Sequence, residues 1–129
     1  MNLLEGALGI HEQALRVRTQ RLEVLAQNIA NADTPNYKAR DVDFRSVLAE
    51  VGTLSTSMAA THQMHLQNGD NPEADGLRYR IPFNTAMDGN TVEMSVEQAQ
   101  YGKAAAEYQA TLSFLESRVS SARKALRGE

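Results

Sequence analysis

The sequence predicts a mainly α-helical fold, in which long N- and C-terminal heptad helices pack as an antiparallel coiled coil around a short extended or β-containing middle segment. Apolar residues recur at alternating four- and three-residue spacing over both ends of the 129-residue chain. The middle has no such period and is rich in turn residues. We expect one domain, with an N-terminal helix over 1–32, an extended strip, loops and short strands over 33–95, and a C-terminal helix over 96–127.

The first helix is predicted from about Leu3 to Asn31. Its apolar seam contains Leu4, Leu8, Leu15, Leu22, Leu25 and Ile29. His11 and Arg18 interrupt the seam, and polar residues at such positions can set register or partner in a coiled coil.

The second helix has the same rhythm. Its seam contains Tyr101, Ala105, Tyr108, Leu112, Leu115, Val119, Ala122 and Leu126. Ser95 and Gln98 have the spacing of a capping box at its start. At its end, basic residues complement the helix dipole and Gly128 can close the last turn. The connection between the two helices is long enough for the chain to double back.

An elaborate stop follows the first helix, in the stretch ANADTPNYKARDVDF (residues 30–44). The short side chains of Asn28, Asn31 and Asp33 compete with the helix for backbone hydrogen bonds, and Pro35 disfavours helical backbone at Thr34. The sequence therefore predicts an extended strip from Tyr37 to Phe44, and we expect this strip to touch another subunit.

Shorter elements are predicted between the helices. Residues 44–51 fit a short helix, and LRYRIPF (77–83) alternates as a strand does, with Pro82 favouring an edge or irregular position. Asp88-Gly89-Asn90 is a turn signal, after which residues 91–94 could extend briefly before the second helix.

Few residues of the sequence suggest a catalytic or metal-binding site. His62 and His65 share a helical spacing, but two more zinc ligands are needed and the chain has no cysteine. Asp41 and Asp43 could form a carboxylate pair, although a solvated strand face is the simpler interpretation. Glycine-rich phosphate loops and serine or cysteine nucleophile motifs are missing from the sequence. We therefore expect no enzyme, no cofactor, no metal and no small-molecule substrate.

Net charge and hydropathy limit the classes of partner that the sequence favours. The net charge of −3 argues against a nucleic-acid binder that relies on bulk charge. Residues 1–15 lack the pattern of a cleaved signal peptide, and no stretch approaches the length of a transmembrane segment. We expect no membrane span and, if the protein is exported, a route without a cleaved leader.

Apolar residues outside the seams suggest assembly. On the two helices they are Leu3, Ala7, Ile10, Ala14, Val17, Val24, Ala104 and Phe114. Because helices gain most of their stability by packing an apolar face, this surplus favours self-assembly or a helical partner. A single soluble helical domain, a coiled-coil adaptor and an export chaperone are the alternatives.

The stop segment also carries a family resemblance. LAQNIANADTPNYKARDVDF (25–44) resembles the N-terminal signature of bacterial flagellar axial proteins, the rod and hook proteins. YRIPF (79–83) and MDGNTVEM (87–94) make the chain most similar, within that group, to proximal-rod subunits. The signature positions are Asn28, Asn31, Thr34, Pro35, Tyr37, Arg40, Asp41 and Phe44.

The resemblance implies a structural subunit of a hollow rod that crosses the periplasm in the flagellar basal body. Such subunits leave the cell unfolded through the flagellar type III channel and assemble with their end helices in the inner layer. The implied partners are copies of itself, other flagellar rod proteins, and the membrane-ring and export-gate proteins at the base of the rod.

Overall fold

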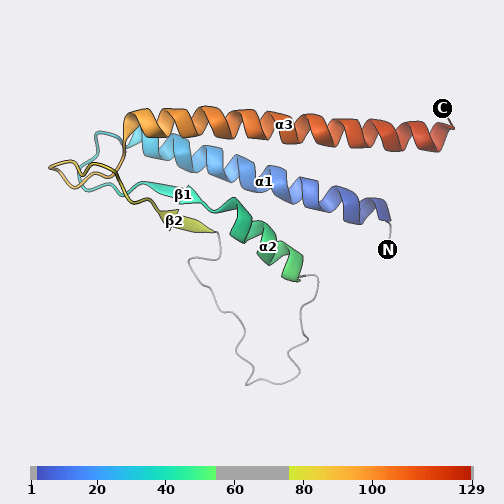
Figure 1. The fold of residues 1–129 in the computed structure, drawn as a ribbon, viewed down its shortest axis with the longest axis horizontal. Coiled ribbons are helices and arrows are strands. Elements are labelled where there is room, and N and C mark those ends of the chain that lie inside the picture. The colour runs from blue at the N-terminus through green and yellow to red at the C-terminus, as the bar shows by residue number, and fades with distance from the viewer. Residues whose placement is uncertain (1–2, 55–75, 129) are drawn as a thin grey trace, which may run out of the picture.

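A computed structural model describes residues 3–54 and 76–128 of the chain (Figure 1). Its elements are α1 (Leu3–Ala30), β1 (Arg40–Val42), α2 (Phe44–Leu54), β2 (Leu77–Tyr79) and α3 (Met94–Arg127). The protein is mainly helical, with long helices near both ends and a two-stranded sheet in the middle, as the sequence predicts.

Helix α1 is the central element of the described structure. Helix α3 runs along one side of α1 in the opposite chain direction, and β1, β2 and α2 lie on its other side (Figure 1). The two chain termini therefore lie at one end of the molecule, and the loops that leave α1 and enter α3 lie at the other.

The apolar core is thin and lies between α1 and the middle segment. Val17 and Val24 of α1 pack with Val42 of β1, and Phe44, Val47 and Leu77 close over this cluster. The side chains of Ala14, Leu25 and Ala104 are also buried. The expectation that Ala14, Val17, Val24 and Ala104 face other chains is therefore wrong. The heptad pattern predicts a single packing partner for α1 within the chain, the C-terminal helix. In the structure α1 packs against α3 on one side and against the middle segment on the other.

The two ends of α3 differ in how they are capped. The helix begins at Met94 with Glu93 as its N-cap residue and no side-chain cap bond, so the predicted capping box at Ser95 is wrong. Gly128 closes the other end as predicted, because its φ of 73° allows its N–H to reach the carbonyl of Lys124.

The middle segment folds back on itself. Strands β1 and β2 pair antiparallel, with Asp41 opposite Arg78. Asp43 follows β1 and accepts a hydrogen bond at 3.3 Å from the backbone N–H of Ser46, so it caps α2. The short helix after Phe44 and the strand within residues 77–83 are confirmed, whereas residues 91–93 form no strand.

Candidate functional site

Three stretches that lie far apart in the sequence meet where α1 ends and α3 begins (Figure 1). They are residues 28–41, 78–83 and 88–97, which we call the junction. The first runs from the last turn of α1 into β1, the second from β2 into the loop that follows it, and the third into the first turn of α3. All three overlap the motifs that carry the family resemblance, so the junction is the natural candidate for the functional part of the chain.

Asn90 holds the turn that follows α1, although it lies far from that turn in the sequence. Its buried side-chain Nδ2 lies 3.0, 2.8 and 2.9 Å from the carbonyl oxygens of Asn31, Ala32 and Thr34, so its two hydrogens are shared among these three acceptors. These carbonyls belong to the turn that follows Ala30, where the regular helical hydrogen bonds have ended, and Asn90 brings a side-chain donor to that turn. The stop segment and residues 88–94 are therefore a single structural unit.

Backbone contacts extend this unit. The N–H of Thr91 donates to the carbonyl of Tyr37 at 2.9 Å, and the hydroxyl of Thr91 accepts from the N–H of Ala39 at 2.7 Å. Gly89, at φ 78°, passes so close to Asn36 that a Cβ on it would lie 2.5 Å from the Asn36 Oδ1 atom. The positive φ favours glycine at this position, and a Cβ would also displace the Asn36 side chain.

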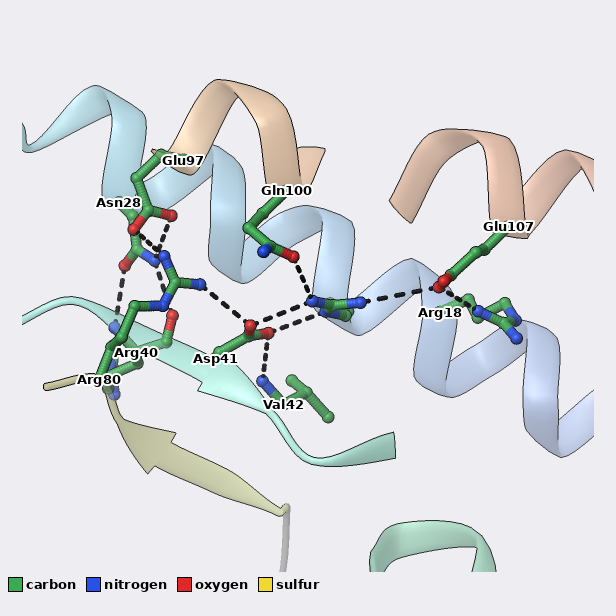
Figure 2. A network of polar contacts seen from close by, with 10 residues as sticks. Arg18, Asn28, Arg40, Asp41, Val42, Arg80, Glu97, Gln100 and Glu107 are labelled. Carbon is green, nitrogen blue, oxygen red and sulfur yellow. Dashed lines mark hydrogen bonds and ion pairs between the residues drawn. The ribbon is translucent and has the colours of Figure 1, made fainter. Parts of the chain in front are cut away.

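Two polar side chains, Asn28 of α1 and Glu97 of α3, are fully buried beside each other. Nδ2 of Asn28 donates to Oε2 of Glu97 at 3.0 Å and to the carbonyl of Arg40 at 2.6 Å, and Oδ1 accepts from the Arg40 N–H at 3.1 Å (Figure 2). Arg80 donates to the other Glu97 oxygen. Since a buried charge without a partner is costly, Arg80 makes the burial of Glu97 possible.

Asp41 connects the Asn28–Glu97 pair to the polar contacts farther along α1 and α3 (Figure 2). It accepts hydrogen bonds from Arg21 at 2.9 and 3.2 Å, from Arg80 at 3.0 Å and from the N–H of Val42 at 2.7 Å. Burial alone would raise the pKa of Asp41, but the hydrogen bonds and charge of Arg21, with the donors on Val42 and Arg80, hold this pKa below its usual value. The bond to Asp41 likewise raises the pKa of Arg21.

The polar chain continues along the helices. Arg21 donates to Gln100 at 3.0 Å, and Arg18 donates to Glu107 at 2.7 Å. The Arg18 guanidinium also lies 4.3 Å from the centre of the Phe44 ring, so it faces an aromatic ring of α2 as well as α3. Paired charges thus join α1, β1, the end of β2 and α3, and this arrangement is a structural clamp.

The predicted seam residues are buried to very different degrees. On α1, Leu25 is fully buried, Leu8, Leu15, Leu22 and Ile29 are half-buried, and the side chain of Leu4 lies outside the described residues. On α3, Tyr108, Leu112 and Leu115 are half-buried, whereas Tyr101, Val119 and Leu126 are exposed. Glu97 and Ala104 are the buried residues of α3, so its contact with α1 runs beside the predicted seam.

The signature residues divide into two groups. Asn28, Arg40 and Asp41 take part in the clamp, and Asn31 accepts a hydrogen bond from the hydroxyl of Thr34 at 3.1 Å. Thr34 and Pro35 are exposed, and Tyr37 and Phe44 are half-buried. Contact of these positions with another subunit stays a prediction.

Sequence reasoning missed Asn90, Glu97, Arg21 and Arg80 as members of this site. An available signal was the second motif, MDGNTVEM, whose asparagine was interpreted only as part of a turn. Asp41 and Asp43 do not form the suggested carboxylate pair. Asp41 is part of the clamp, whereas Asp43 caps α2 and lies 3.5 Å from Arg78. His62 and His65 lie outside the described residues.

An elongated helix pair with a polar clamp at one end and exposed apolar side chains defines a structural assembly subunit. Comparison with known proteins gives the same class, since residues 8–38 match the family of flagella basal body rod proteins.

Curated relatives extend this match to nearly the whole chain. The flagellar basal body rod protein FlgB of Salmonella typhimurium is 38% identical, over 99% of this chain and 98% of its own length. FlgB of Aeromonas hydrophila is 44% identical over 97% and 96%, and that of Escherichia coli K12 is 41% identical over 92% and 91%. The chain belongs to the FlgB family of flagellar basal body rod proteins.

Family membership makes this chain a structural subunit of the rod in the flagellar basal body. This assignment takes the place of the adaptor and chaperone alternatives. Within residues 3–54 and 76–128, no helix has the length and hydropathy needed to cross a membrane.

Proposed function

We propose that the chain is a non-catalytic rod subunit that assembles with copies of itself and with other rod proteins into a hollow drive shaft and export conduit. The two long helices form the shaft wall, and the junction fixes their relative position. The exposed apolar side chains carry this proposal. Ile10, Phe114, Val119 and Leu126 on the helices, and Tyr79, Ile81, Phe83 and Met87 around β2, are all exposed.

Such exposure is informative because a protein that works alone rarely shows many large apolar side chains together. Burying a side chain such as leucine or phenylalanine contributes about 2 kcal/mol. Contacts between chains can therefore supply stabilisation that the thin core of one chain does not.

The coiled coil belongs to this proposal. The seam positions from Tyr101 to Leu126 are only partly covered by α1, so neighbouring helices can complete knobs-into-holes packing along them. The same argument applies to the half-buried leucines on the predicted seam of α1. The antiparallel helix pair of one chain would then be one unit of a larger helical layer.

The stop segment contributes to assembly in two ways on this proposal. Its buried members, Asn28 and Asp41, hold the junction together from inside the chain. Its outer members, Thr34, Pro35 and Tyr37, contact a neighbouring subunit, and so does the part of Phe44 that the core leaves uncovered. The junction would thus present a fixed surface to that neighbour.

The place of assembly follows from the family. We propose that the subunit lies in the periplasmic part of the rod, near the membrane ring and the export gate, and meets their proteins there. A thin core suits delivery as an unfolded chain, because little folding free energy opposes threading.

The test is a charge placed in the seam. Leu115→Asp on α3 and Leu22→Asp on α1 should each prevent incorporation into basal bodies and abolish swimming, because assembly would bury an unpaired carboxylate. Ser117→Asp adds the same charge at an exposed position of α3 and should leave swimming intact.

Circular dichroism of the purified variants checks that the helices persist. Normal swimming and normal basal bodies in the Leu115→Asp strain would contradict the seam assignment.

A further inference from the structure

The segment between β2 and α3 lies at the loop end of the molecule, away from the start of α1 and the end of α3 (Figure 1), and it carries three large apolar side chains. Ile81 is 89% exposed, Phe83 is 88% exposed and Met87 is fully exposed. We call these three residues the loop-end patch. They follow β2 directly, and Tyr79 at the end of β2 extends the exposed apolar surface.

The loop-end patch is fixed in position by the junction. Arg80 turns inward to Asp41 and Glu97, so in extended chain its neighbours Tyr79 and Ile81 point outward. The carboxylate of Glu93 accepts hydrogen bonds at 3.2 Å from the backbone N–H groups of Phe83 and Asn84. The patch is therefore a presented surface, held by contacts to the helix pair.

A second exposed apolar surface lies at the opposite end of the molecule. Leu115, Val119, Ala122 and Leu126 follow one another at helical spacing on a single face of α3, and we call them the helix-end stripe. Leu115 and Ala122 of the stripe are half-buried, whereas Val119 is exposed and Leu126, the last of the four, is 81% exposed. Helix α1 thus covers the stripe incompletely toward the C-terminus of α3.

The two surfaces have opposite net charge around them. Residues 114–127 carry Arg118, Arg123, Lys124 and Arg127 against Glu116, a net charge of +3. Around the loop-end patch, residues 31–38 and 81–93 carry Asp33, Asp88 and Glu93 against Lys38, a net charge of −2, while Arg78 and Arg80 just before the patch are paired with Asp43 and with Asp41 and Glu97. Apolar surfaces with complementary rims favour contact with each other over contact with themselves.

We propose that the loop-end patch is a docking surface for the helix-end stripe of a second copy of this chain. The two surfaces lie at opposite ends of one elongated molecule, so the contact is heterologous and leaves a free surface at each end of the pair. Contacts of this kind propagate, and they give rings or open helical assemblies. The inference rests on the proposed self-assembly and adds the pair of surfaces that carries it.

Disulfide crosslinking tests the pairing cleanly, because the chain contains no native cysteine. Asn84→Cys lies beside Phe83, and Ala125→Cys lies beside Leu126. Both positions are exposed, and neither variant removes a residue of the patch or the stripe. Ala106→Cys, at an exposed position nearer the start of α3, is the matched control.

Purified full-length variants are mixed in pairs and oxidised. We expect Asn84→Cys with Ala125→Cys to give a crosslinked dimer at about tenfold or higher yield than Asn84→Cys with Ala106→Cys, because docking raises the effective concentration of the two thiols. A chain that carries both Asn84→Cys and Ala125→Cys should give a ladder of oligomers. High salt should lower the yield by screening the charged rims.

A further variant, Phe83→Asp, should abolish the excess crosslinking while the helical circular dichroism is unchanged, since Phe83 is exposed in the single chain. Sedimentation of the unmodified chain separates this inference from the proposed function. Association with crosslinking only between two Asn84→Cys chains would overturn the head-to-tail pairing and leave self-assembly standing. No association at any concentration reached would overturn both.

Discussion

The junction and the far end of α3 are built from the same helix pair, yet they are stabilised in opposite ways. At the junction, α1 and α3 meet through the fully buried Asn28 and Glu97, and Asn90 occupies three carbonyls at the end of α1. Beyond Leu115, α3 keeps Val119 and Leu126 exposed. At the junction the contact between α1 and α3 is completed within the chain, whereas the far end of α3 leaves part of its helix face for a neighbour.

The difference shows how a subunit with a thin core obtains a definite shape. Apolar contacts tolerate sliding of one helix along another, whereas hydrogen-bonded charges fit in one register only. The clamp from Glu97 to Arg18 therefore fixes how α3 lies on α1, at a cost in desolvation that polar pairs always carry. Assembly contacts can then form on surfaces whose position is already set.

Among the variants considered, the loss of the Glu97 side chain should lower the free energy of unfolding most. Glu97→Ala leaves Arg80 and Asn28 without their buried partner, and we expect the free energy of unfolding to fall by about 3 kcal/mol. Urea denaturation followed by circular dichroism measures it. Glu116→Ala, the same change at an exposed position of α3, should change stability by less than about 0.5 kcal/mol. Equal losses in the two variants would remove the distinction between the two ends of α3.

Removing the Asn90 amide should have a smaller effect. Asn90→Ala removes the side-chain donor that the carbonyls of Asn31, Ala32 and Thr34 share in the turn after α1, and we expect the free energy of unfolding to fall by about 2 kcal/mol. The matched control is Asn84→Ala, because Asn84 is exposed in the same segment. Thermal unfolding of both variants compares them. A loss at Asn84 as large as that at Asn90 would show that Asn90 has no special role as a cap.

The smallest change in the free energy of unfolding should come from the Asp41 carboxylate, and this change should depend on pH. Its pKa is lower in the folded chain than the ordinary value of about 3.9, so its stabilising contribution is complete above about pH 4 and is lost as the pH falls through the folded-state pKa. Asp41→Asn should therefore cost about 1 kcal/mol at pH 7 and less at pH 3.

Denaturation at several pH values measures the difference in unfolding free energy between the two proteins. A difference that stays constant from pH 7 to pH 3 would contradict the role of the Asp41 carboxylate.

Long elements with a strong period were predictable, whereas the clamp was not. The helices, the stop after α1, the strand after Leu77 and the closing Gly128 each follow from local spacing or from one residue type. Arg18 and Arg21 also lie within a strong helical pattern, but their partners come from residues that are far away in the sequence. A one-dimensional pattern shows a charged side chain on a helix and does not show which carboxylate it will meet.

The same limit explains the seam. A heptad pattern assumes a single partner along one face, but α1 packs against α3 on one side and against β1 and α2 on the other. Val17 and Val24, counted as surplus for other chains, are buried by the middle segment instead. Asn90 escaped notice because a turn asparagine and a helix-capping asparagine have the same sequence signature, and only the fold brings Asn90 to the end of α1.

Hydrogen exchange of the purified single chain tests most directly the claim that α1 and α3 are held together within the chain at the junction, while the far end of α3 awaits a neighbour. Slow exchange is expected for the amides of Ala39, Arg40 and Thr91, which are hydrogen-bonded within the junction. Residues 116–127 of α3 should exchange many times faster in the single chain and become protected when the chain assembles. Equal protection of both regions in the monomer would contradict the account.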